Sequence, residues 1–161
     1  MNSKQKFRQS QGGVIDRSRP LDFTFNNKSY QGYFGDTLAS ALLANGIRVI
    51  SRSFKFHRPR GIFSSGVEEP NALLKVDYGA GTIPLASATT IPLVDNLSAE
   101  SENCFPSVNF DLGRFLDYTK PLWPAGFYNK TFKWPSWHTY EWAIRKTAGL
   151  TRLPDDLNQT Q

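Results

Sequence analysis

The sequence is poor in residues that bind metals through sulfur or nitrogen. Among its 161 residues it has one cysteine, Cys104, and two histidines, His57 and His138. One thiol excludes a disulfide framework within the chain and a cluster held by several thiolates. Neither histidine has an acid or a cysteine beside it, so the pattern does not favour a metal site or a catalytic triad. We predict no metal ligand, and we interpret Cys104 as a small buried side chain rather than a nucleophile.

Long apolar runs are also missing. The start, MNSKQKFRQSQGG, is polar and lacks the hydrophobic segment of a secretory signal, and no later run is long enough to span a bilayer. We therefore expect a cytoplasmic protein without a membrane partner. A phosphate-binding glycine loop is absent as well, because Pro84 stands in GAGTIP where a dinucleotide fingerprint needs its third glycine.

The overall composition is that of a globular protein. Hydrophobic residues make up 39% and charged residues 20%, and the length suits one domain with an appendage. The net charge of +5 would suit an anionic partner, but acidic and basic residues are mixed along the chain. The charge alone is therefore a weak indication of nucleic-acid binding.

The first half of the chain shows strand and helix patterns in a recognisable order. Leu21, Phe23 and Phe25 alternate with polar residues, and 26–30 reads as a turn before a second strand, which predicts a β-hairpin. Asp36 then precedes a helical pattern over 37–46 as its cap. Gly46 ends this pattern as a C-terminal glycine does.

Extended segments follow the predicted helix. We expect strands over 49–56 and 72–79, and two apolar runs, 82–90 and 90–94, to close the module near Asn96. Two strands, a helix and further strands are typical of the α+β class. They predict a β-grasp sheet, of the 2Fe-2S ferredoxin-like kind, over one helix.

Beyond about residue 98 the chain becomes rich in aromatic residues and proline. Of the 22 aromatic residues, 12 lie between Phe105 and Trp142, interrupted by prolines that break regular structure. The segment 135–150 predicts one helix, with Ser136 as cap and Gly149 as stop. We therefore divide the chain into a flexible N-terminus (1–18), the module (19–98), and an aromatic, extended arm with a C-terminal helix (99–161).

The loop RSFKFHRPRG, residues 52–61, interleaves aromatic and basic residues. Stacking rings with phosphate-seeking cations are what single-stranded nucleic acid requires, so a nucleic-acid strand is one interpretation. A strand with Phe54 and Phe56 packed inward is the interpretation we favour. A third is that the cations meet the phosphates of a dinucleotide or the acids of a neighbouring domain, which makes Arg58 and Arg60 the candidate cofactor contacts.

The paired motifs RSFKFHRPRG and EEPNAL, with PAGFYNKTFKWP and AIRKTAGL farther on, carry a family resemblance. From about Gly12 to Leu153 the chain resembles the N-terminal region of the alpha subunit of heterotetrameric sarcosine oxidase. Related dehydrogenases carry a similar ferredoxin-like domain, whose loop after the helix holds a [2Fe-2S] cluster through cysteines. At the corresponding residues, 62–71, this chain has no cysteine, which implies a retained scaffold without an iron-sulfur cluster. We expect hydrogen bonds, and a pair between Arg58 or Arg60 and Glu68 or Glu69, to stabilise it instead.

The resemblance also implies a function for the complete enzyme in sarcosine catabolism. The family demethylates sarcosine oxidatively to glycine and hydrogen peroxide, passes the one-carbon unit to tetrahydrofolate, and uses FAD, FMN and NAD. Its NAD and folate domains would follow this region, and substrate oxidation belongs to the beta subunit. By resemblance, we expect the chain to be a fragment or a natural short product that has no catalytic residue, binds no cofactor and is inactive alone, within an oxidoreductase acting on CH-NH donors.

The expected partners are the remainder of the alpha subunit and the other sarcosine oxidase subunits. We predict that the tryptophans of the arm make the contact, namely Trp123, Trp134, Trp137 and Trp142. Two alternatives remain. One is a stand-alone module that binds nucleic acid or another anionic partner through the basic aromatic strand, although we do not expect nucleic acid. The other is an electron-transfer ferredoxin, which the cysteine count opposes.

Overall fold

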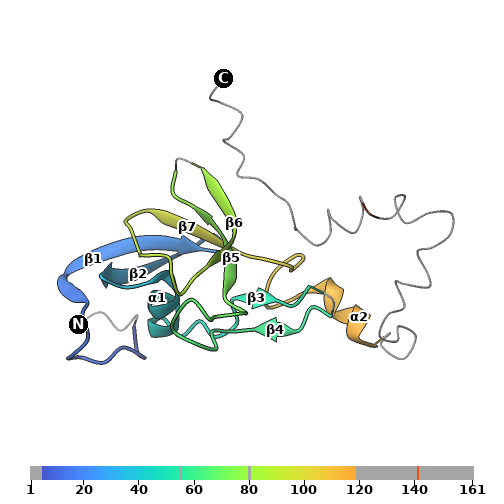
Figure 1. The fold of residues 1–161 in the computed structure, drawn as a ribbon, viewed down its shortest axis with the longest axis horizontal. Helices are drawn as coiled ribbons and strands as arrows, with labels where there is room; N and C mark the ends of the chain where they lie inside the picture. Colours follow the sequence, from blue (N-terminus) through green and yellow to red (C-terminus); the bar gives the residue numbers. More distant parts are fainter. Residues whose placement is uncertain (1–4, 55, 80, 119–140, 142–161) are drawn as a thin grey trace, which may run out of the picture.

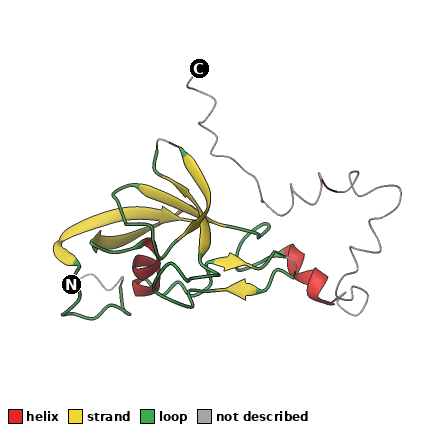
Figure 2. Cartoon of the chain, viewed as in Figure 1, coloured by secondary structure: helices red, strands yellow, loops and turns green. Residues whose placement is uncertain are grey.

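A five-stranded sheet with a helix against it dominates the computed structural model, which describes residues 5–54, 56–79, 81–118 and 141 (Figure 1). The strand order is β2-β1-β7-β5-β6, and β3 and β4 form a separate two-stranded ribbon (Figure 2). The sheet strands are β1 (Asp16–Phe25), β2 (Lys28–Phe34), β5 (Leu73–Asp77), β6 (Thr82–Ser87) and β7 (Leu97–Ser101).

The predicted hairpin is present, with a tighter turn than expected. Only Asn26 and Asn27 lie between β1 and β2, and both adopt positive φ angles, 50° and 61°. Two such residues are typical of a turn whose twist matches that of the strands. The predicted turn over 26–30 was too long, because Lys28 already pairs with Phe25 and Tyr30 with Phe23.

Helix α1 (Leu38–Ala44) lies where the pattern predicts it, but its cap is Thr37 rather than Asp36. The Thr37 side chain accepts from the Ser40 backbone N–H at 3.2 Å, and the Ser40 hydroxyl accepts from the Thr37 N–H at 3.0 Å. This reciprocal pair is a capping box. Gly46 follows the helix with φ of 81°, as a C-terminal glycine should.

The last strand of the sheet was not predicted. β7 pairs in parallel with β1 and antiparallel with β5, so it lies in the middle of the sheet. It spans residue 98, where we divided the chain, and β1 begins at Asp16, before residue 19. The run 90–94, predicted as extended, has no strand of its own; Pro92 makes only an isolated bridge to Thr37. The division into three parts remains a prediction.

The core lies between α1 and the sheet. Leu38 and Leu42 of the helix pack with Phe23 of β1 and with Leu74 and Val76 of β5, all of them buried. Burying one such side chain contributes about 1.5–3 kcal/mol. Ile50, Ala86, Leu93, Leu97 and Ala99 extend this cluster across the sheet.

The predicted strand over 49–56 is wrong for most of its length. Strand β3 covers only Ser51–Arg52, it pairs with β4 (Pro59–Arg60), and the chain turns between them. Phe54 is 44% exposed, so it does not pack inward as expected. The reason is that Phe54 lies in the turn between β3 and β4, outside both strands of a ribbon that is separate from the large sheet.

After β7 the chain forms two short helical turns, η1 (Leu112–Arg114) and α2 (Phe115–Tyr118). The C-terminal helix predicted over 135–150 lies outside the described residues, and so does most of the arm. For the rest, a mixed sheet with one covering helix agrees with the β-grasp, ferredoxin-like fold expected from the element order.

Candidate functional site

A buried carboxylate, Asp111, joins the segment 105–113 to the loop between β3 and β4. Its Oδ1 accepts from the backbone N–H of Phe105 at 3.0 Å and of Gly113 at 3.1 Å. Its Oδ2 lies 2.8 Å from Nδ1 of His57. The side chain of Asp111 therefore fixes the segment 105–113 to the loop between β3 and β4.

Arg52 also connects the loop between β3 and β4 to the segment 105–113, and we call these contacts the junction. It is 5% exposed, and its Nε and Nη2 donate to the carbonyl of Val108 at 2.8 and 2.7 Å. Its Nη1 donates to the carbonyl of His57 at 2.8 Å, and its Nε lies 3.8 Å from Oδ2 of Asp111. A buried guanidinium is costly unless its donors are satisfied, and here the carbonyls of Val108 and His57 accept from them.

The junction depends on an ionised Asp111 and on a glycine beside it. Burial opposes the ionisation of Asp111, but the N–H groups of Phe105 and Gly113 and the contact with His57 outweigh it and lower the pKa of this carboxyl. A Cβ on Gly113 would overlap the imidazole ring of His57. Glycine at this position therefore lets the ring reach the carboxylate.

The segment held by Asp111 and α2, which follows it, expose apolar side chains. Phe105 is 70%, Phe110 65%, Phe115 66% and Tyr118 75% exposed, and we call these four side chains the 105–118 face. A cavity of about 270 Å³ lies at it, lined by Arg52, Asn109, Phe110, Asp111, Arg114, Phe115 and Tyr118. Exposed aromatic rings gathered on one short segment are typical of a protein-protein contact.

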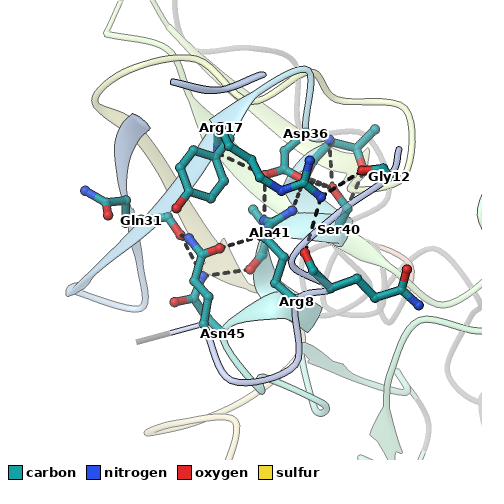
Figure 3. Close-up of polar contacts among 12 residues, drawn as sticks. Arg8, Gly12, Arg17, Gln31, Asp36, Ser40, Ala41 and Asn45 are labelled. Carbon is teal, nitrogen blue, oxygen red and sulfur yellow. Dashed lines mark hydrogen bonds and ion pairs between the residues drawn. The ribbon is translucent and has the colours of Figure 1, made fainter. Parts of the chain in front are cut away.

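A larger groove, of about 650 Å³, lies between the N-terminal segment and α1. Arg8 enters it and binds both oxygens of Asp36, at 3.0 and 2.6 Å (Figure 3). The same carboxylate accepts from the Ser40 hydroxyl at 2.6 Å and from the Tyr33 N–H at 2.9 Å. Because Arg8 is paired with Asp36 inside the protein, we interpret this groove as the place where the N-terminal segment packs on α1.

The loop 61–72 closes around a second buried carboxylate, that of Glu69, which is 5% exposed. Backbone N–H groups from both ends of the loop donate to it. The predicted pairing of this residue or of Glu68 with Arg58 or Arg60 stays a prediction. Arg58 and Arg60 have exposed side chains, and the Arg58 guanidinium lies 5.2 Å from the centroid of the Phe56 ring.

The remaining predicted residues contribute little to a site in the described part of the chain. The Cys104 thiol is half-buried and lies 3.8 Å from the carbonyl of Ser101. Burial, followed by the charge of Asp111, raises its pKa, which suits a structural thiol rather than a nucleophile. The predicted partner contacts and the second histidine lie outside the described residues, namely Trp123, Trp134, Trp137, His138 and Trp142.

Sequence reasoning missed the pair of His57 and Asp111. The two residues are 54 positions apart, and neither has a neighbouring acid or histidine that would indicate the contact. The only local signal was the turn chemistry of residues 111–113, where an aspartate precedes a glycine.

Comparison with protein families identifies the class of protein to which this chain belongs. Residues 18–104 match the 2Fe-2S iron-sulfur cluster binding domain, and the chain belongs to this family. More particularly, it is homologous to the N-terminal region of the sarcosine oxidase alpha subunit, an oxidoreductase component. Among the described residues, no helix combines the length and apolar character needed to cross a membrane.

Three relatives share this similarity. The alpha subunit of sarcosine oxidase from Rhizobium meliloti (strain 1021) is 49% identical over 147 residues, which are 89% of this chain and 15% of the relative. Those from Corynebacterium sp. strains P-1 and U-96 are 47% and 43% identical, each over 56% of this chain and 10% of the relative. The chain thus spans 15% or less of the length of these relatives.

Among solved structures, L-proline dehydrogenase from P. horikoshii is similar to this chain. The two are 28% identical, with a TM-score of 0.45, over 54% of this chain and 16% of that one.

The residues of this chain do not fit the cluster that gives the family its description. A [2Fe-2S] cluster needs four ligands, usually thiolates, and the chain has one cysteine. Within the described ranges no group of three or more histidine, cysteine or acidic side chains could hold a metal ion. In the loop 61–72 the backbone N–H groups point at the Glu69 carboxylate, so a protein anion already uses them.

Proposed function

We propose that the chain is a structural module, without a cluster, of a sarcosine oxidase-type complex, and that it binds the remainder of an alpha-type subunit. The observation that supports this most is the 105–118 face. Four aromatic side chains, each at least 65% exposed, lie on this face, and the buried Asp111 holds the backbone of the first two by accepting from the N–H groups of Phe105 and Gly113. Because Asp111 already orders residues 105–113, a partner that covers this part of the face loses little entropy in ordering it.

The choice of partner follows from the relatives. Each is a sarcosine oxidase alpha subunit of which this chain corresponds to 15% or less, so most of an alpha-type polypeptide is available to cover the face. The tryptophans predicted to make contacts, Trp123, Trp134, Trp137 and Trp142, continue the aromatic sequence of this face along the chain.

In this proposal the complex performs the chemistry and the module supports its assembly. The complex oxidises sarcosine to glycine with release of hydrogen peroxide, transfers the one-carbon unit to tetrahydrofolate, and uses FAD, FMN and NAD bound by other polypeptide. The module contributes no catalytic group and acts in the cytoplasm. It is inactive alone because the flavin site lies elsewhere.

The test uses a family alpha subunit that lacks this region, expressed with its other subunits, and this chain supplied in trans. We expect the chain to copurify with the complex and to restore peroxide release. A triple variant, Phe110→Ser, Phe115→Ser and Tyr118→Ser, should fail to copurify, because it removes the apolar face without touching Asp111. Val14→Ser is the matched control, since Val14 is 95% exposed and lies in the N-terminal segment, away from this face.

Two results would contradict the proposal. If the truncated complex turns over at full rate alone, the module is dispensable, and the stand-alone binding module becomes the better hypothesis. The exposed Phe54, near the exposed Arg58 and Arg60, would then be the surface to test. If the triple variant copurifies as the control does, the partner binds elsewhere.

A further inference from the structure

In the loop 61–72 several backbone N–H groups point at one carboxylate, and the proposed function gives this arrangement no role. The N–H groups of Phe63 and Ser64 donate to Oε2 of Glu69 at 2.6 and 2.5 Å. Those of Asn71 and Ala72 donate to its Oε1 at 2.7 and 3.2 Å. We call these four groups the N–H cradle. Both oxygens of one carboxylate thus connect the beginning of the loop to its end, directly before β5.

A cradle of this kind needs an acceptor that carries negative charge. Successive N–H groups that point at one place form a concave, positively polarised site for an anion. Ala72 is fully buried, so water is a poor substitute partner for its N–H group. Burial opposes the ionisation of Glu69, but the four hydrogen bonds outweigh it and hold the pKa of this carboxyl below its usual value. Glu69 is therefore ionised at neutral pH.

The loop has further anchors that do not involve Glu69. The Thr89 hydroxyl donates to the carbonyl of Gly66 at 2.7 Å, and the Ser51 hydroxyl donates to the carbonyl of Asn71 at 2.8 Å. Because these contacts tie the loop to the turn after β6 and to β3, replacing Glu69 should loosen the loop without unfolding the core. The role of the carboxylate can therefore be measured in a folded protein.

We propose that the Glu69 carboxylate is an internal anion that orders the loop 61–72 in place of an iron-sulfur cluster. In a cluster-binding domain the metal group and its thiolates hold such a loop together, and the sulfurs accept hydrogen bonds. Here the glutamate provides the negative charge and the acceptors from within the loop. The loop therefore reaches its folded form without iron.

The experiment compares Glu69→Ala and Glu69→Gln with Glu68→Ala and Glu68→Gln in the whole chain. Glu68 is adjacent and exposed, which makes it the matched control. Amide exchange of Phe63, Ser64, Asn71 and Ala72 is the readout. We expect the Glu69 variants to exchange at these amides about tenfold to a hundredfold faster, as the loss of charge-assisted hydrogen bonds implies. The Glu68 variants should stay within about twofold of the wild type.

Anion rescue separates this role from simple packing. In Glu69→Ala the vacated cradle should take up formate, so that formate slows exchange at the same four amides and raises the melting temperature. The wild type and Glu68→Ala should not respond, because their cradle is filled. Protection in the wild type should also be equal after growth with and without added iron.

Three results would overturn the proposal. The first is wild-type protection of the four amides in Glu69→Gln, which would show that the charge is not needed. The second is equal responses of Glu69→Ala and Glu68→Ala to formate. The third is wild-type protection that rises when iron is supplied.

Discussion

Replacing Asp111 with asparagine tests whether its charge joins the loop between β3 and β4 to the segment 105–113. The amide oxygen of the variant can still accept from Phe105 and Gly113. Its NH₂ group would then stand where Oδ2 lies, 2.8 Å from Nδ1 of His57 and 3.8 Å from Nε of Arg52. One charge-assisted hydrogen bond is lost, and a buried guanidinium loses its counter-charge. Together these effects should lower the free energy of unfolding by about 2–4 kcal/mol.

The assay is urea unfolding followed by far-ultraviolet circular dichroism. Glu100→Gln is the control, because Glu100 is half exposed and its contact with Lys75, at 3.4 Å, is a surface ion pair. Such a pair contributes about 0–1 kcal/mol. The control should therefore unfold close to the wild type, while Asp111→Asn unfolds at clearly lower urea.

The pH dependence of the unfolding free energy is an independent test of the same prediction. Although burial opposes it, the pKa of Asp111 is lowered in the folded protein by its backbone donors and by His57. A lowered pKa contributes stability that is fully present above the unfolded value, about 3.9 for aspartate, and is lost as the pH falls through the folded value. The difference between wild type and Asp111→Asn should therefore be present at pH 7 and shrink below about pH 4. A difference under about 0.5 kcal/mol at pH 7, or one unchanged into acid, would refute the role given to this charge.

Two further predictions concern the helix and the missing cluster. Thr37→Ala removes the capping bond to the Ser40 N–H and should cost about 0.5–2 kcal/mol of unfolding free energy by the same urea assay; an unchanged midpoint would show that the capping box is not needed. The chain purified without oxygen should contain no stoichiometric iron or sulfide and show no visible absorption, because Cys104 supplies one thiolate; iron and sulfide in a cluster ratio would contradict this.

Local patterns were enough to predict the first part of the fold. The alternation of Phe23 and Phe25 and the glycine at position 46 depend on neighbours in sequence, and both were interpreted correctly. The cap was wrong because Asp36 and Thr37 are both good capping residues. In the structure the Asp36 carboxylate instead binds Arg8, 28 residues away, a contact that no local pattern shows.

The missed features depend on distant partners or on the backbone. In β7 only Leu97 and Ala99 are buried, so its apolar pattern is short, and its place in the sheet comes from β1. The contact of Asp111 with His57 likewise needs the folded chain. Hydrogen bonds were expected to stabilise the loop 61–72, but not which groups would bind Glu69; its donors are the backbone N–H groups of the loop. Nearly every residue has a backbone N–H group, so the sequence does not indicate which of these groups bind a side chain.

The parallel pairing of β1 with β7 has a consequence for how the chain folds. Thr24 of β1 bonds Ser98 of β7 across 74 positions, so this contact has a high sequence separation. During synthesis β1 and β2 can form their hairpin early, but the other edge of β1 stays open until β7 has left the ribosome. Contacts of this kind slow folding, and an open edge beside Phe23 and Phe25 invites pairing with another chain. Ending the chain before Leu97 would make that exposure permanent, so aggregation is the expected fate of such a shortened protein.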